Sequence, residues 1–271
     1  MNVIKDIKHL YKPIQPHVRH TAENVSYVEF LPHTELQDVV YCYWQLKTTH
    51  PLIEPFIYRV VADGCMDIFF EINIPHHNFI MGFCKQYTEF PLEHSFNYVG
   101  VRFLPTMFPQ LIKIDASELS NRFEHLNTID PTTSTFIAQH FHPKKTIEEI
   151  KALFDTYFLD LLSKSNFIYD VRLYKAIDII LKNHGVLNIE KDLDTGISPR
   201  QLRRLFEIYI GETAKTFSKV VRFQNVLKSN PSSQGLRQTK LFFESGYYDQ
   251  SHFIKEFKTY YGLKPSKALG I

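Results

Sequence analysis

Short apolar segments, separated by polar and turn-forming residues, fill the first half of the chain. Residues 41–46 and 98–103 have the length and composition of strands, and the second segment alternates strictly. Its Val99, Val101 and Phe103 fall on one face, whereas Tyr98 and Arg102 fall on the other. This pattern predicts a β-rich region.

Two further apolar runs, residues 56–62 and 65–72, are separated by Asp63 and Gly64. An Asp-Gly pair favours the positive-φ turn of a tight hairpin, so we expect these two runs to pair with each other. Many short strands with turn residues at such intervals indicate a β-sandwich or a barrel-like domain. We assign this domain to residues 1–143.

The periodicity changes to that of helices in the second half of the chain. Apolar residues within 145–164 follow helical spacing and predict a helical connector over residues 144–167. This helix either packs on the β-rich domain or pairs with a second copy of the chain. Another helix, over residues 171–181, opens an all-α domain that we assign to residues 168–271.

Two segments of the all-α domain repeat one order of turn, cap and amphipathic helix. In the first, Gly196 supplies a turn, Ser198 an N-cap and Pro199 the first helical position, and Gly211 ends the helix. The residues expected on its buried side are Leu202, Leu205, Phe206 and Tyr209.

In the second segment, Gly246 supplies the turn, Asp249 the N-cap and Gly262 the end of the helix, and Pro265 opens a last helix. Its buried side consists of Phe253, Phe257 and Tyr260, at positions i, i+4 and i+7. Each segment has the layout of a helix-turn-helix. Residues 213–227 between them predict one longer helix, a rigid spacer between two DNA-reading units.

The segment from Gly246 to Ser266 resembles the second helix-turn-helix of the AraC/XylS family of bacterial transcription regulators. The earlier segment resembles the first unit, and Arg222-Phe223-Gln224 resembles the linker helix of the same family. The resemblance covers roughly the last hundred residues. Residues 61–68 and 99–105 are more weakly similar to the sensory domain that precedes the DNA-binding part in some members.

The resemblance implies a sequence-specific regulator whose two recognition helices enter successive major grooves of promoter DNA. The positions implied to contact DNA are Arg200, Arg203 and Arg204 in the first unit and Gln250, Ser251, Ile254 and Lys255 in the second. Arginine is suited to guanine and glutamine to adenine in the major groove. RNA polymerase, a small-molecule effector and a second copy of the chain are further implied partners. The direction of regulation stays open.

The chain departs from the family pattern at three positions. Asp192 and Phe242 replace the small residue, often Ala, that lets the two helices of each unit approach closely, and Val226 replaces a small residue of the linker helix. Residues 188–195 are also short and polar for a supporting helix. The first unit is therefore expected to be looser than the second, and a family member that binds protein instead of DNA stays an alternative.

The charge of the chain is divided unevenly between its two parts. From Ile168 onward there are seventeen Lys and Arg against ten Asp and Glu, which leaves fourteen basic and nineteen acidic residues before it. A basic C-terminal part is suited to the phosphate backbone of DNA. Three separated cysteines and an N-terminus without an apolar signal segment suggest a cytoplasmic protein without disulfides or membrane spans.

A ligand site in the N-terminal domain is a separate expectation. If Arg59 and Arg102 point inward, they are suited to bind an acidic ligand, with Trp44, Tyr58 and Phe103 as stacking walls. These residues are alternatively core aromatics and surface arginines.

Catalytic and metal chemistry find little support in the sequence. No phosphate-binding glycine loop, nucleophile elbow or H-E-x-x-H motif occurs, so we expect no enzyme and no cofactor. His76 and His77 are adjacent, which is not a spacing of metal ligands on a helix or strand. A metal-binding β-barrel or an enzyme with a helical accessory domain is kept as the alternative class.

Overall fold

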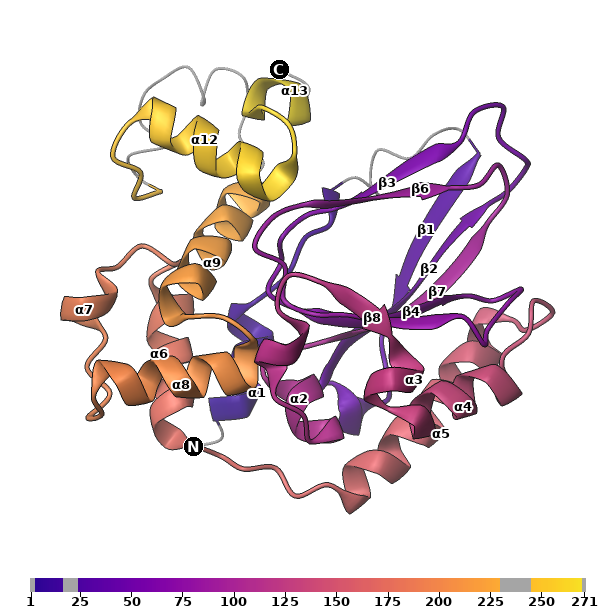
Figure 1. The fold of residues 1–271 in the computed structure, drawn as a ribbon, viewed down its shortest axis with the longest axis horizontal. Coiled ribbons are helices and arrows are strands. Elements are labelled where there is room, and N and C mark those ends of the chain that lie inside the picture. Colours follow the sequence, from indigo (N-terminus) through magenta and orange to yellow (C-terminus); the bar gives the residue numbers. More distant parts are fainter. Residues whose placement is uncertain (1–2, 17–23, 230–244, 270–271) are drawn as a thin grey trace.

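The computed structural model describes residues 3–16, 24–229 and 245–269. Its N-terminal part is built on two antiparallel sheets (Figure 1). The larger sheet has the order β1-β2-β7-β4-β5-β8, and the smaller one pairs β3 with β6. The strands are β1 Val25–Phe30, β2 Val40–Thr48, β3 Phe56–Val60, β4 Met66–Glu71, β5 Asn78–Met81, β6 Thr88–Leu92, β7 Asn97–Phe103 and β8 Phe123–His125. The predicted β-rich domain and its strands at 41–46 and 98–103 are confirmed.

The predicted hairpin between residues 56–62 and 65–72 is wrong. Both runs form strands, but β3 pairs with β6 in the small sheet and β4 pairs with β5 and β7 in the large one. The turn chemistry itself is present, because Gly64 has a φ of 73° and the Asp63 carboxylate accepts a hydrogen bond from the Cys65 N–H at 3.0 Å. Asp63 and Gly64 therefore carry the chain from one sheet to the other.

Helices cover the face of the large sheet that points away from β3 and β6. They are α2 Met107–Ile112, α3 Leu126–Ile129, α4 Pro131–His140 and α5 Ile147–Lys164, with short 3-10 turns η2 Thr34–Leu36 and η3 Ala116–Leu119. The helix predicted over 145–164 is α5, and it packs within the chain. Phe154 stacks on Tyr43 of β2 with ring centroids 4.9 Å apart, and Phe158 meets Phe103 of β7 edge-on at 5.5 Å.

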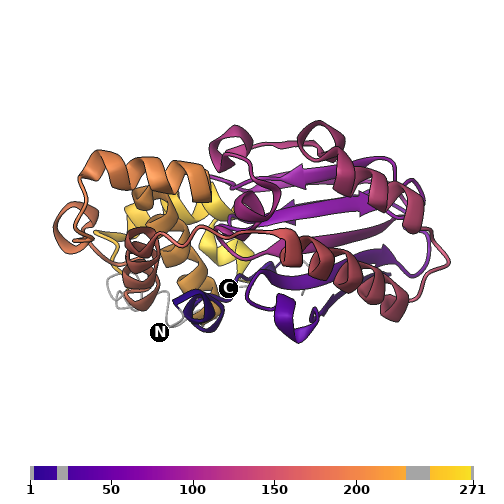
Figure 2. The same cartoon turned by 90° about the horizontal axis from the view of Figure 1, so that it is seen from below.

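The C-terminal part is all-helical. Its described helices are α6 Val171–Lys182, α7 Ile189–Asp192, α8 Pro199–Ile210, α9 Ala214–Ser229, α12 Gln250–Tyr261 and α13 Pro265–Ala268. Helix α1, Val3–Leu10, packs against α6 although it lies at the other end of the sequence, and Figure 2 shows it among the C-terminal helices. In the described portion of the chain, no helix has both the length and the apolar character needed to cross a bilayer.

The two parts contact each other at both recognition-type helices. The end of α8 lies against η3, where an added Cβ at Gly211 would come within 2.8 Å of the Ala116 carbonyl oxygen. The end of α12 meets the loops of the small sheet, because the Tyr87 N–H donates to Thr259 O at 3.2 Å and the Ala62 N–H to Tyr260 O at 3.3 Å.

Candidate functional site

Helix α8 begins and ends as the sequence predicts. Ser198 and Gln201 form a capping box, with the Gln201 N–H donating to Ser198 Oγ at 3.3 Å and the Ser198 N–H donating to Gln201 Oε1 at 3.1 Å. Gly196, at φ 75°, forms the preceding turn, and Gly211, at φ 91°, ends the helix. These terminal contacts fix where the first turn of α8 points.

Local contacts also fix both ends of helix α12. The Asp249 carboxylate accepts from the His252 N–H at 2.7 Å, and Gly262 ends the helix at φ 91°. The turn residue Gly246 has a φ of 73°, and an added Cβ would lie 2.3 Å from Val186. Glycine is therefore required here by both backbone conformation and space.

Both helices pack on the single helix α9, as predicted for the spacer. Phe206 of α8 lies 6.1 Å from Phe217, and Phe257 and Tyr260 of α12 lie 5.4 and 5.3 Å from Phe223. In Figure 1, α8 and α12 lie at opposite ends of α9. One helix thus sets the separation of the two units.

Arg222 of α9 fastens the second unit, a role that the sequence did not indicate for it. Its guanidinium donates to the Gly246 carbonyl at 3.1 Å and to Glu256 of α12 at 2.5 Å, and it lies 4.2 Å from the centre of the Tyr247 ring. Glu256 and Tyr247 are buried. The turn and the helix of the unit are therefore held by the same side chain.

The side chains implied to contact DNA lie on the outer sides of α8 and α12. Those that are exposed are Arg200, Arg203, Arg204, Gln250, Ser251 and Lys255. Arg203 also donates to Glu207 at 2.8 Å, and Ile254 is partly buried against the core. The structure thus presents one polar and basic row on each helix.

A groove of about 840 Å³ lies between α7, α8 and α9, and His252 of α12 also lines it. Its basic lining residues are Arg203, Lys215, Lys219, Arg222 and His252. The sequence did not indicate Lys215 and Lys219, because they lie on the spacer helix and only the fold brings them into one groove with Arg203 of α8.

The three departures from the family pattern have different outcomes. Asp192 is exposed, and its carboxylate accepts a hydrogen bond from the Asn188 N–H at 2.7 Å. Asp192 therefore contacts the N-cap of its own short helix α7 and does not lie between two helices. Val226 is buried in the core. Phe242 lies outside the described residues.

The N-terminal domain contains a cavity of about 210 Å³ between its two sheets. Trp44, Tyr58 and Arg102 line it. Phe103 does not, because the alternation of β7 turns it to the opposite face of the sheet, where it meets Phe158. Arg59 does not line the cavity either, since it pairs with Glu89 and lies near the ring of Tyr87.

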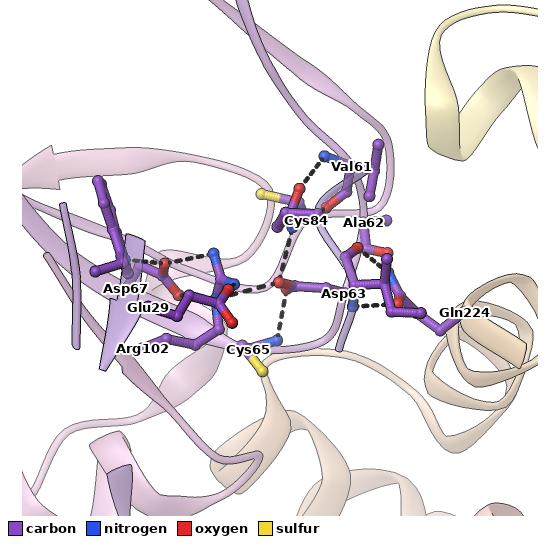
Figure 3. A network of polar contacts seen from close by, with 12 residues as sticks. Glu29, Val61, Ala62, Asp63, Cys65, Asp67, Cys84, Arg102 and Gln224 are labelled. Atoms are coloured by element: carbon purple, nitrogen blue, oxygen red, sulfur yellow. Dashed lines mark hydrogen bonds and ion pairs between the residues drawn. The ribbon is translucent and has the colours of Figure 1, made fainter. Parts of the chain in front are cut away.

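Arg102 is fully buried at one end of this cavity and already has carboxylate partners (Figure 3). Its Nε and Nη2 donate to Asp67 at 3.1 and 2.9 Å, while Asp63 and Glu29 lie 3.4 and 3.7 Å from it. Burial raises the pKa of Asp67 to about 6, although Arg102 acts in the opposite direction. The expectation that Arg102 and Arg59 together bind an acidic ligand is therefore not met by this geometry.

A chain of hydrogen bonds connects this cluster to the all-helical part (Figure 3). Asp63 accepts from Gln15 Nε2 at 2.8 Å, and Gln15 also bonds both polar groups of the Val61 backbone. Gln224 of α9 donates to the Ala62 carbonyl at 2.8 Å and accepts from the Ile14 N–H at 2.7 Å. The turn of residues 61–64 therefore contacts both Arg102, which lines the cavity, and Gln224 of the spacer helix.

Two protein families match parts of the sequence. Residues 28–125 match a domain of unknown function, DUF6597, and residues 194–270 match a helix-turn-helix domain. Among curated proteins, none matches the chain.

Solved structures of ToxT from Vibrio cholerae are similar to the chain at low identity. An apo form of a ToxT variant from strain SCE256 is 14% identical, with a TM-score of 0.40 over 91% of this chain and 96% of that one. Wild-type ToxT bound to an unsaturated fatty acid is 13% identical, with a TM-score of 0.38 over 92% and 97%.

The family match covers both predicted recognition helices together with the spacer between them. Residues 194–270 are therefore a helix-turn-helix domain of the AraC type, and the chain is a DNA-binding regulator in which this domain follows a β-rich domain.

Proposed function

We propose that this regulator reads two neighbouring segments of promoter DNA, one with α8 and one with α12, and that its β-rich domain adjusts this binding in response to a small molecule. The observation that carries the proposal is the attachment of both capped helices to α9, each with a polar and basic row left exposed. A rigid pair of this kind is suited to engage two grooves on one face of a duplex.

Base recognition is assigned to the exposed residues of the two helices. The first turns of recognition helices approach base edges, and Arg200 and Gln250 occupy such positions. Arg204 lies one turn beyond Arg200, and Lys255 lies one turn beyond Ser251, on the exposed sides of the two helices. Arginine bonds guanine through both O6 and N7, and glutamine bonds adenine in the same manner.

Phosphate binding is assigned to the groove between α7, α8 and α9. Lys215 and Lys219 of α9 line this groove together with Arg203 of α8 and His252 of α12. The DNA backbone between two successive major grooves would face this space, so these charges are suited to position the duplex without reading its sequence.

Effector input is assigned to the cavity of the β-rich domain. The turn of residues 61–64 lies between the Asp67–Arg102 pair and Gln224 of α9. A molecule that favours one arrangement of this turn would change the relative stability of DNA-competent and DNA-incompetent forms.

The assignment is tested by substitution after selection of a bound promoter fragment. Arg204→Ala and Lys255→Ala are each expected to weaken specific binding by about 1–3 kcal/mol, because a lost base contact removes this much discrimination. Affinities are measured by mobility shift at physiological salt. Lys175→Ala, an exposed lysine of α6, removes the same charge away from both rows and serves as the control.

If both variants bind as tightly as the parent, the recognition rows are assigned incorrectly. If Lys175→Ala weakens binding as much as the other two, the effect belongs to overall charge. The mass of the protein–DNA complex, measured separately by analytical ultracentrifugation, tells whether one copy or two occupy the fragment.

A further inference from the structure

The cavity between the sheets has apolar aromatic walls and one polar end. Phe69, Phe79, Phe90 and Phe123 contribute its walls, and these rings also contact one another, with centroids 5.4 to 5.9 Å apart. Asp67 and Arg102 form the polar end, beside the indole of Trp44. Sites of this composition bury a flat apolar body and orient it by a few polar contacts.

The polar end has an excess of negative charge. The single guanidinium of Arg102 faces the carboxylates of Asp67, Asp63 and Glu29, all within 3.7 Å. Arg102 Nη1 is buried without a hydrogen-bond acceptor among the described residues, but Glu29 already supplies the opposite charge beside it. A ligand oxygen that accepts a hydrogen bond from Arg102 Nη1 therefore need not be anionic.

An acidic ligand would bring another carboxylate into this buried cluster. The cost of desolvating this carboxylate would not be offset, because the guanidinium of Arg102 is already shared among Glu29, Asp63 and Asp67. Asp67, in contrast, accepts from Trp44 Nε1 at 3.0 Å and from Arg102, and a carboxylate has about four lone-pair sites, so one more donor is accommodated.

We propose that this cavity binds a one-ring or two-ring apolar molecule whose polar group is a hydroxyl or amine that donates to Asp67, and that it rejects the corresponding carboxylic acids. This inference deepens the proposed effector input by naming the class of ligand. The volume agrees with it, since a dry apolar cavity of about 150 Å³ holds benzene, and the cavity here is about 210 Å³.

The test uses three probes that share a ring and differ in the polar group: 2-phenylethanol, 2-phenylethylamine and phenylacetate. Trp44 is the only tryptophan of the chain and lines the cavity, so its fluorescence reports occupancy directly. Titrations of the full chain at neutral pH, repeated by calorimetry, are expected to give saturable binding of the alcohol and the amine. Phenylacetate is expected to bind at least about tenfold more weakly than the alcohol and the amine, because it adds an uncompensated buried charge.

Two substitutions locate the binding. Val60→Phe fills the cavity from β3 and is expected to abolish binding of both probes, whereas Val28→Phe, on β1 outside the cavity lining, leaves it unchanged. Asp67→Asn removes the charge with little change of shape and is expected to weaken the amine about tenfold more than the alcohol. Thermal melting checks that each variant is folded, and if Asp67→Asn is not, the probe series and the Val60→Phe pair still decide.

Equal or tighter binding of phenylacetate would overturn the inference, as would the failure of the alcohol and the amine to bind. Persistence of binding in Val60→Phe would place the ligand elsewhere and overturn it as well. None of these titrations contains DNA, so their failure is distinct from a failure of the recognition rows in the mobility shifts.

Discussion

At the scale of single residues, the position of Trp44 depends on the absence of a side chain opposite it. Trp44 of β2 and Gly100 of β7 are direct partners in the antiparallel ladder. A Cβ added at Gly100 would lie 2.2 Å from the indole, which is closer than atoms can approach. Gly100 therefore lets the indole lie flat on β7 and form one wall of the cavity.

Gly100→Ala is expected to lower the free energy of unfolding by about 1–3 kcal/mol, because the added methyl overpacks this contact. Urea denaturation followed by circular dichroism measures the change. In a Trp44→Phe background, the same substitution is expected to lower the free energy of unfolding much less, because the smaller phenylalanine ring leaves room for the added methyl. Equal costs in both backgrounds would show that the indole is not the obstacle.

Some residue-scale features follow from the sequence, and others need the fold. Strict alternation along residues 98–103 correctly separates Arg102 from Val101 and Phe103. The partners of Arg102 could not be predicted, because Glu29 and Asp67 come from two other strands and Asp63 from a turn. The alternation of a strand can thus predict that an arginine points inward. It cannot predict whether carboxylates from other segments already compensate the charge of that arginine.

At the scale of elements, Gln224 joins helix α9 to the turn between the two sheets. The side chain is buried, and its amide bonds backbone groups of Ile14 and Ala62. The amide therefore satisfies several buried groups at once.

Gln224→Ala is expected to destabilise the chain by about 1–3 kcal/mol, because it leaves the Ile14 N–H and the Ala62 carbonyl unsatisfied. Asn225→Ala, at the next position of α9 and only partly buried, is the matched control and is expected to change little. Chemical denaturation of both variants measures the difference. A Gln224 variant as stable as its control would mean that water replaces these bonds without cost.

Element boundaries were predictable where local chemistry decides them. Ser198, Asp249 and the glycines at 211 and 262 mark helix ends through contacts within a few residues. The Asp63–Gly64 turn was equally visible, but its local geometry does not reveal which sheet the next strand joins. Strand partners are chosen by packing between distant segments, so the hairpin prediction failed.

At the scale of the whole molecule, the excess of basic residues lies in the DNA-binding half, and part of it lines the groove beside α9. Lys215→Ala is expected to weaken binding to all DNA sequences alike and to reduce the slope of log K against log salt by about one unit, as loss of one phosphate contact does. Lys144→Ala, an exposed lysine before α5, removes the same charge and should leave the slope unchanged. Affinities at a series of salt concentrations measure both slopes.

The packing of α1 on α6 means that the hydrophobic interior of the DNA-binding half is not contiguous in sequence. Ile7 and Tyr11 are buried, and Tyr11 lies 6.3 Å from Phe217 of α9. A fragment of residues 168–271 would lack Ile7 and Tyr11, so we expect it to have a lower melting temperature than the full chain. A synthetic peptide of residues 1–16, added in trans, should raise that melting temperature, whereas a peptide with Ile7→Asp and Tyr11→Asp should not. Genetic dissection of this regulator therefore has to keep residues 3–16 together with the C-terminal helices.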